Sequence, residues 1–244
     1  MKVFNIDIEF DRPRLHTAIA NCIKGGKGYV CFVDATILSI ARKDQSYLTV
    51  LQNAMVSSCD GGSIAAMINS IYGTNVRAYN GPDLFEDYIG QDQYRQLLVG
   101  STDETYQMIE KELRRRGLPS EHISHLPLPF AKVEDFDYPT IAETINTVNP
   151  DIVWVSLGAP KQELFMSNIL PYIHRGVLFG IGAALNFYIG NNIQPKIHIG
   201  ALRFIWLDRI YREPKKQLRR CWKIIRALPF LYLDEWRRKK QSSS

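Results

Sequence analysis

The stretch DIVWVSLGAPKQE, residues 151–163, joins a short apolar run to a glycine turn and a helix start. The run from Asp151 to Val155 has the length and apolar character of a buried strand. Gly158 permits a tight exit from that strand, and Pro160 suits the first turn of a helix. The stretch therefore predicts a strand–turn–helix unit. It is either an ordinary connection or a phosphate site at a helix N-terminus.

Strands and helices alternate along the rest of the chain. Segments with helical spacing lie between further apolar runs of strand length, at residues 2–8, 28–33, 54–59, 94–100 and 176–181. This alternation predicts an α/β fold with a Rossmann-like, mostly parallel sheet, helices on both faces, and a basic helical C-terminal appendage. We expect the core to span residues 1–195 and the appendage residues 196–244. Neither GxGxxG nor GxxxxGK[ST] occurs, so a standard dinucleotide fold or a P-loop kinase is not supported.

The composition is that of a globular protein, with 244 residues of which 45% are hydrophobic. The four cysteines have no CxxC spacing, so neither a disulfide framework nor a zinc site is predicted. The N-terminus begins with a strand pattern in place of a signal peptide, and no apolar run approaches the roughly 20 residues that span a bilayer. We therefore expect a cytosolic protein that is not integral to a membrane.

The net charge of +5 is unevenly distributed. Residues 201–240 hold 13 Lys+Arg against 4 Asp+Glu, whereas the remaining residues hold 17 against 21. We predict one helix at 199–212 and another after Pro214, at 215–238. In the second helix, aromatic and apolar residues alternate with arginine and lysine, which is typical of a helix on an anionic membrane surface. A helix packed on the core with a charged outer face is the alternative. A nucleic-acid partner is not expected, because no nucleic-acid motif occurs.

Candidate site residues follow the predicted strands. Asp60 comes after an apolar run and before two glycines, so its carboxylate could serve as a general base on a hydroxyl. A turn aspartate that caps the next helix is the commoner alternative. Asp34 ends the run 28–33, at the edge where open α/β sheets bind ligands. Arg77 is either a phosphate contact or a solvated surface residue, and we expect the small residues from Gly182 onward to line a cleft.

Taken together, these residues resemble the WecG/TagA/CpsF family of bacterial glycosyltransferases (glycosyltransferase family 26). The similarity covers nearly the whole chain and follows the order of the family's motifs. The matching residues are Asp60-Gly61 after a strand, Arg77 followed by Gly81-x-Asp83-Leu84, GAPKQE at 158–163, Gly180-x-Gly182 before Asn186-Phe187-x-x-Gly190, and Trp206-x-x-Arg209-x-x-x-Glu213-Pro214.

The resemblance implies an inverting, metal-independent glycosyltransferase without a cofactor. Such an enzyme moves a sugar from a UDP-sugar to an undecaprenyl-diphosphate-linked saccharide in the synthesis of exopolysaccharide, capsule, teichoic acid or common antigen. The resemblance also implies a cytoplasmic location at the inner face of the bacterial membrane. The appendage would bind the anionic membrane surface and complete the active site, and self-association of the core is a family habit.

The resemblance also suggests roles for individual residues. Asp60 would be the general base, and Arg209, Lys216 and Arg219 would be the cations near the diphosphates. The residues expected to bind substrate are Asp34, Arg77, Gly158, Gln162, Glu163 and Asn186.

The sequence departs from the family at several of these positions. Phe32-Val33-Asp34 replaces the usual Thr-x-Asn, and Asn186-Phe187 replaces Asp-Phe. Lys216 stands where arginine is usual and lacks its bidentate fork. The donor is therefore open between N-acetylmannosaminyl and hexosyl types such as glucosyl, galactosyl or glucuronosyl. The altered Phe32 and Asp34 also allow an alternative function, a catalytically silent, membrane-docked protein that binds nucleotide sugars.

Overall fold

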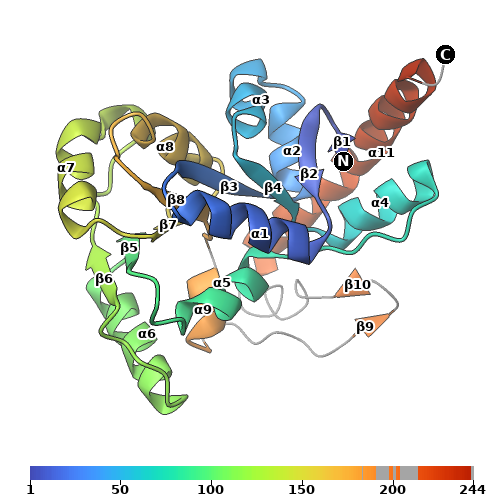
Figure 1. Ribbon diagram of the computed structural model, residues 1–244. Coiled ribbons are helices and arrows are strands. Elements are labelled where there is room, and N and C mark those ends of the chain that lie inside the picture. The colour runs from blue at the N-terminus through green and yellow to red at the C-terminus, as the bar shows by residue number, and fades with distance from the viewer. Residues whose placement is uncertain (183, 191–197, 200–201, 204–213, 243–244) are drawn as a thin grey trace.

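The computed structural model describes residues 1–182, 184–190, 198–199, 202–203 and 214–242 (Figure 1). Its main sheet has eight strands in the order β1-β2-β4-β3-β8-β7-β5-β6. Every neighbouring pair is parallel except β1 with β2. The strands are β1 (Lys2–Val3), β2 (Ile6–Glu9), β3 (Lys27–Val33), β4 (Val56–Cys59), β5 (Gln96–Gly100), β6 (Ile123–Leu126), β7 (Ile152–Ser156) and β8 (Gly176–Gly180). The predicted mostly parallel α/β fold is confirmed.

Helices cover both faces of this sheet, as predicted. The buried side chains form two clusters, one on each face. One face carries α1 (Arg12–Ile23), α5 (Gly81–Ile89), α6 (Asp103–Arg115) and α9 (Ala184–Tyr188). The other carries α2 (Ala35–Ala41), α3 (Gln45–Gln52), α4 (Gly62–Tyr72), the 3-10 helix η1 (Val133–Asp135), α7 (Tyr138–Val148), α8 (Lys161–Ile169) and α11 (Pro214–Ser242).

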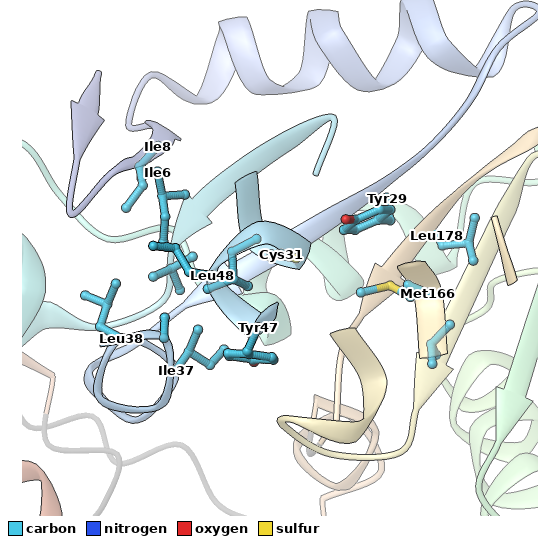
Figure 2. Packing of buried hydrophobic residues seen from close by; sticks show 14 of the residues in the cluster. Ile6, Ile8, Tyr29, Cys31, Ile37, Leu38, Tyr47, Leu48, Met166 and Leu178 are labelled. Carbon is cyan, nitrogen blue, oxygen red and sulfur yellow. The ribbon is translucent and has the colours of Figure 1, made fainter. Parts of the chain in front are cut away.

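The central strand β3 shows why both faces need cover. Tyr29, Cys31 and Val33 belong to one buried cluster, whereas Val30 and Phe32 belong to the other. Side chains alternate along a strand, so an apolar run of this kind is stable only between two layers of helices. Figure 2 shows part of one layer, in which side chains of α2, α3 and α8 (Ile37, Leu38, Tyr47, Leu48 and Met166) lie against those of β2, β3 and β8 (Ile6, Ile8, Tyr29, Cys31 and Leu178).

Two predicted elements differ from the structure. Residues 2–8 form a tight hairpin of β1 and β2 instead of one strand, because Phe4 and Asn5 turn the chain with positive φ angles of 53° and 61°. The predicted helix at 199–212 is wrong at its start. There β9 (His198–Ile199) pairs antiparallel with β10 (Leu202–Arg203). In such a pair the backbone N–H and C=O groups bond between the strands and not within a helix. The rest of that prediction, residues 204–212, lies outside the described residues.

The last helix, α11, is part of the core on one side. It packs against α2 and α4, and Leu231 is buried in the same cluster as those helices. Its other side exposes apolar side chains to solvent: Trp222, Ile225, Phe230, Leu233 and Trp236. The packing of this helix on the core, one of the two interpretations of the basic tail, is confirmed. Binding to a membrane surface stays a prediction. The predicted domain boundary at 195/196 stays a prediction.

Candidate active site

Four loops leave the sheet at the carboxyl ends of neighbouring parallel strands. Asp60 follows β4, Asp34 follows β3, Gly182 follows β8 and Gly158 follows β7. After β3 the chain enters α2 on one face, and after β8 it enters α9 on the other. In open α/β sheets, ligands bind where neighbouring strands send the chain to opposite faces in this way. This edge is therefore the candidate active site.

Asp60 is fixed in position by backbone hydrogen bonds. Its N–H donates to the carbonyl of Val33 at 3.0 Å, and its Oδ1 accepts from the N–H of Gly81 at 3.1 Å. Gly81 is the first residue of α5, so the carboxylate lies at a positive helix end. Gly61, and not Asp60, is the N-cap of the next helix, α4. The Asp60 carboxylate accepts a hydrogen bond from the start of α5. Asp60 is half-buried, which suits a group that must meet a substrate.

Asp34 has a structural task at this edge. Its Oδ1 accepts a hydrogen bond from Ile37 N at 2.9 Å and caps α2. A Cβ on Gly61 would lie 3.8 Å from the Cα of Asp34, so the loops after β3 and β4 touch. The neighbouring Phe32 does not face the site, because its ring is buried beneath the start of α5, 3.5 Å from where a Cβ on Gly81 would lie.

Arg77 lies on a segment without regular secondary structure that runs beside the end of β4. That segment is held by the N–H of Tyr79, which donates to the Cys59 carbonyl at 2.9 Å, and by Ser58 Oγ, which donates to the Tyr79 carbonyl at 2.7 Å. The Arg77 side chain is exposed. Exposure at this position is compatible with either predicted role.

The GAPKQE turn is held from below by its own Gln162. Gly158 adopts a positive φ of 75° and donates its N–H to Gln162 Oε1 at 3.1 Å. Gln162 Nε2 donates to the Gly180 carbonyl and to Glu163 Oε1, both at 2.8 Å. Glu163 Oε2 accepts from the Tyr47 hydroxyl of α3 at 3.1 Å. The Gln162 and Glu163 side chains are only 5% and 0% exposed.

The glycines at 180 and 182 make room for this amide. A Cβ on Gly180 would lie 2.9 Å from Gln162 Nε2, and a Cβ on Gly182 would lie 3.1 Å from Gln162 Oε1. Gly182 also has a positive φ of 46°, and Ser156 Oγ donates to its carbonyl at 3.1 Å. The small residues Gly180 and Gly182 therefore allow the chain to pack closely around the Gln162 side chain. The cleft that we expected from Gly182 onward stays a prediction.

Burial shifts the acidity of this cluster. Loss of solvent raises the pKa of Glu163 to about 7, and the nearby Asp34 charge adds to the rise, while hydrogen bonds from Gln162, its own N–H and Tyr47 oppose it. Burial and the Glu163 charge also raise the pKa of Tyr47. Glu163 is thus a buried acid that titrates near neutral pH. Tyr47 carried no signal in the sequence beyond helical spacing and was not predicted.

The structure brings the remaining predicted residues together only in part. Asn186 is exposed on α9, which packs against α5 and α6. Lys216 and Arg219 lie in α11, with side chains outside the described ones. Arg209 lies outside the described residues. Their roles stay predictions, as do the substrate contacts expected of Asp34, Gly158, Gln162 and Glu163.

A polar pocket lies at the other end of the strands, away from the candidate active site. It has a volume of about 470 Å³ and is lined from the amino ends of β5, β6 and β7, where Arg175 pairs with Asp151. It is therefore separate from the candidate site. Within the described part of the chain, no group of three His, Cys, Asp or Glu side chains could hold a metal ion. Among the described helices, none has the length and apolar character needed to cross a bilayer.

Comparisons with known proteins point to one family. The profile of the family described as "Glycosyl transferase WecG/TagA/CpsF family" matches residues 1–243. A Bacillus subtilis (strain 168) protein named N-acetylglucosaminyldiphosphoundecaprenol N-acetyl-beta-D-mannosaminyltransferase is 25% identical over 204 residues, which are 81% of this chain and 74% of that protein. A Staphylococcus aureus (strain MW2) protein of the same name is 20% identical over 191 residues, 77% of this chain and 73% of that protein.

Proposed function

The chain belongs to the WecG/TagA/CpsF family of glycosyl transferases, and from this premise we propose that it transfers a sugar from a UDP-sugar to an undecaprenyl-diphosphate-linked saccharide. The names of the Bacillus and Staphylococcus relatives give an acceptor of this kind. The observation that carries the proposal is Asp60, a carboxylate fixed at the carboxyl edge of the sheet by the N–H of Gly81. The product would enter a bacterial cell-surface polysaccharide.

In the proposed reaction, a hydroxyl of the acceptor attacks the anomeric carbon of the donor sugar. Asp60 takes the proton of that hydroxyl as general base. A glycosidic C–O bond forms, and the bond between the anomeric carbon and the UDP oxygen breaks. Attack from the side opposite to UDP inverts the anomeric configuration. UDP leaves with the electron pair of the broken bond.

The leaving diphosphate needs positive charge, because its negative charge grows as the bond breaks. We assign this task to Arg209, Lys216 and Arg219. The packing of α11 against α2 and α4 supports it, since a helix seated on the core can carry cations to a fixed place. Metal-independence follows if these cations suffice. The donor itself would contact the loop around Gly158 together with Asp34, Arg77 and Asn186, with Gln162 and Glu163 shaping that loop from below.

The outer side of α11 supports binding to an anionic membrane from the cytoplasmic side. Trp222 is 61% exposed, and four more apolar side chains are exposed farther along the helix. Cations flank them: Arg226 lies 5.8 Å from the Trp222 ring centre and Lys240 lies 3.9 Å from that of Trp236. Apolar side chains bordered by cations suit the interface of an anionic bilayer. Flotation with anionic and with neutral liposomes tests this, and sedimentation without liposomes shows whether two copies pair instead.

A donor screen tests the function. Purified full-length protein is mixed with a short-chain polyprenyl-diphosphate N-acetylglucosamine, liposomes and a panel of UDP-sugars that includes N-acetylmannosamine, glucose, galactose and glucuronic acid. We expect acceptor-dependent release of UDP with one donor. Equal release with EDTA present is the result expected for metal-independent catalysis. Anomeric analysis of the product by NMR tests inversion.

Silence with every donor would count against the transferase. A direct titration with UDP then separates the two remaining cases. Binding of UDP without transfer favours a catalytically silent protein that binds nucleotide sugars. The buried Phe32, which stands in place of threonine, is the observation that suggests this alternative. No binding of UDP contradicts the proposed donor class.

A further inference from the structure

The side chain of Glu163 points away from the site and into the protein, yet two hydrogen bonds through the Gln162 amide connect it to the Gly158 turn. Its two oxygens are used by different elements: Oε1 accepts from Gln162 of α8, and Oε2 accepts from Tyr47 of α3. The carboxylate is fully buried. A buried acid is destabilising unless its bonds are made, so these contacts have a specific structural purpose.

The orientation of the Gln162 amide depends on its neighbours. Its NH₂ group meets two acceptors, the Gly180 carbonyl and Glu163, while its oxygen meets the Gly158 N–H. A flipped amide would set its oxygen against two acceptors and its NH₂ against a donor. The amide therefore has one favourable orientation, and Glu163 supplies one of the two acceptors that select it.

We infer that Glu163 is a positioning residue for sugar transfer, which fixes the Gln162 amide and through it the left-handed Gly158 turn that borders the donor nucleotide. The inference rests on the proposed function for the identity of that donor. Gly158 has open space beside it as far as the described residues go, because apart from its chain neighbours none of their atoms lies within 4 Å of the place where a Cβ would stand. The turn is thus held by Gln162 on its protein side and is open on the side of its Cβ position, which leaves room for a ligand.

The charged and titratable groups around Glu163 leave few other candidates for this role. Tyr47 faces it from α3, Cys31 from β3 and Asp34 from the start of α2. Burial raises the pKa of Tyr47 and, well above its ordinary value, that of Cys31, so both stay neutral at physiological pH. Glu163 is therefore the group in this cluster that both bonds to Gln162 and changes charge.

Three variants of the full chain test the inference. Glu163→Leu keeps the volume and removes both acceptors, whereas Glu163→Gln keeps one acceptor for Gln162. Tyr47→Phe removes the bond on the far side of Glu163. We expect Glu163→Leu to weaken UDP binding about tenfold, on the order of one hydrogen bond. Glu163→Gln should restore most of that loss, and Tyr47→Phe should bind UDP like the wild type.

Amide hydrogen exchange of the peptide spanning 156–163 gives a readout that needs no ligand. It should rise in Glu163→Leu and return toward the wild-type rate in Glu163→Gln. If Glu163→Leu does not fold, Gln162→Met takes its place, since it removes the acceptor for the Gly158 N–H and leaves Tyr47 and Glu163 in contact.

Four results would overturn the inference. The first two are an unchanged exchange rate and unchanged UDP binding in Glu163→Leu, or in Gln162→Met where that variant replaces it. The others are no recovery of UDP binding in Glu163→Gln, or a loss of UDP binding in Tyr47→Phe as large as that in Glu163→Leu. The last would show general loosening of the fold. A wild type that binds no UDP contradicts the proposed function alone. The exchange rates of the 156–163 peptide then still decide whether Glu163 fixes the turn.

Discussion

The backbone N–H of Phe4 donates a hydrogen bond of 2.8 Å to the carboxylate of Glu235, 231 residues later in the chain. The same carboxylate accepts from the Tyr72 hydroxyl at 2.7 Å and pairs with Arg238 at 3.3 Å. Glu235 is only 1% exposed. The N-terminal hairpin and the end of α4 thus hold the last helix against the core, and α11 is anchored at its C-terminal half (Figure 1).

This anchor predicts a large effect of one substitution on stability. Glu235→Leu leaves the buried Phe4 N–H and the half-buried Tyr72 hydroxyl without this acceptor, so we expect the free energy of unfolding to fall by about 2–4 kcal/mol. Urea denaturation at neutral pH measures it. The control is Asp234→Asn, which removes an exposed pair with Arg42 and should change stability by less than about 1 kcal/mol. Equal effects of the two substitutions would contradict the anchor.

The sheet could be predicted because its strands are local features. The predicted apolar runs overlap β3, β4, β5, β7 and β8, and each has the length of a strand and is bounded by turns or helical patterns. The two-residue strands β9 and β10 could not be predicted, because apolar spacing over a few residues fits a helix equally well. The hairpin at Phe4 and Asn5 lacks the glycine that usually marks a turn with positive φ.

The positions of the site residues could be predicted, but their partners could not. Asp60 ends a strand, which the sequence shows, yet its partner Gly81 lies 21 residues later. Tyr47 and Glu163 are 116 residues apart and meet only because α3 packs against α8. Such pairs depend on the arrangement of whole elements, which local periodicity does not contain.

Asp60→Asn is expected to abolish most transfer. The amide oxygen can still accept from Gly81 N, but an amide does not take a proton, so kcat should fall by about 10²–10⁴. UDP affinity should stay within about twofold of the wild type, because the loop geometry is kept. The donor assay and a UDP titration measure the two effects. Asp137→Asn, which changes another carboxylate that accepts a backbone N–H, should leave turnover unchanged. Near-normal turnover of Asp60→Asn would refute the general-base role.

Gly180→Ala tests whether the Gln162 side chain needs a residue without a Cβ at position 180. The new Cβ would lie 2.9 Å from Gln162 Nε2 and 2.9 Å from the Met166 methyl, so overpacking should lower stability by about 1–3 kcal/mol. Gly25→Ala is the matched control, because within the described part of the chain only sequence neighbours come within 4 Å of its Cβ position, and it should change stability by no more than about 0.5 kcal/mol. In a Gln162→Ala background the loss at position 180 should shrink. A loss of the same size there would rule out Gln162 as its cause.

Glu163 predicts how stability depends on pH. Burial raises its pKa from 4.5 to about 7 in the folded protein. Between these values the unfolded chain has lost the proton while the folded protein keeps it, so raising the pH favours unfolding. One pKa unit corresponds to about 1.4 kcal/mol, so the group should remove at most about 3.5 kcal/mol of stability between pH 4.5 and 7 and nothing more above that range.

Glu163→Gln isolates this contribution, because glutamine has no proton to lose and the groups outside this buried cluster titrate alike in both proteins. We therefore expect the wild type to lose stability relative to Glu163→Gln as pH rises from 4.5 to 7, with a constant difference above pH 7 to 8. Urea denaturation of both proteins at half-unit pH steps measures the difference. A difference that stays flat across the window would mean that Glu163 is already ionised at low pH, which its burial between Tyr47 and Gln162 makes unfavourable.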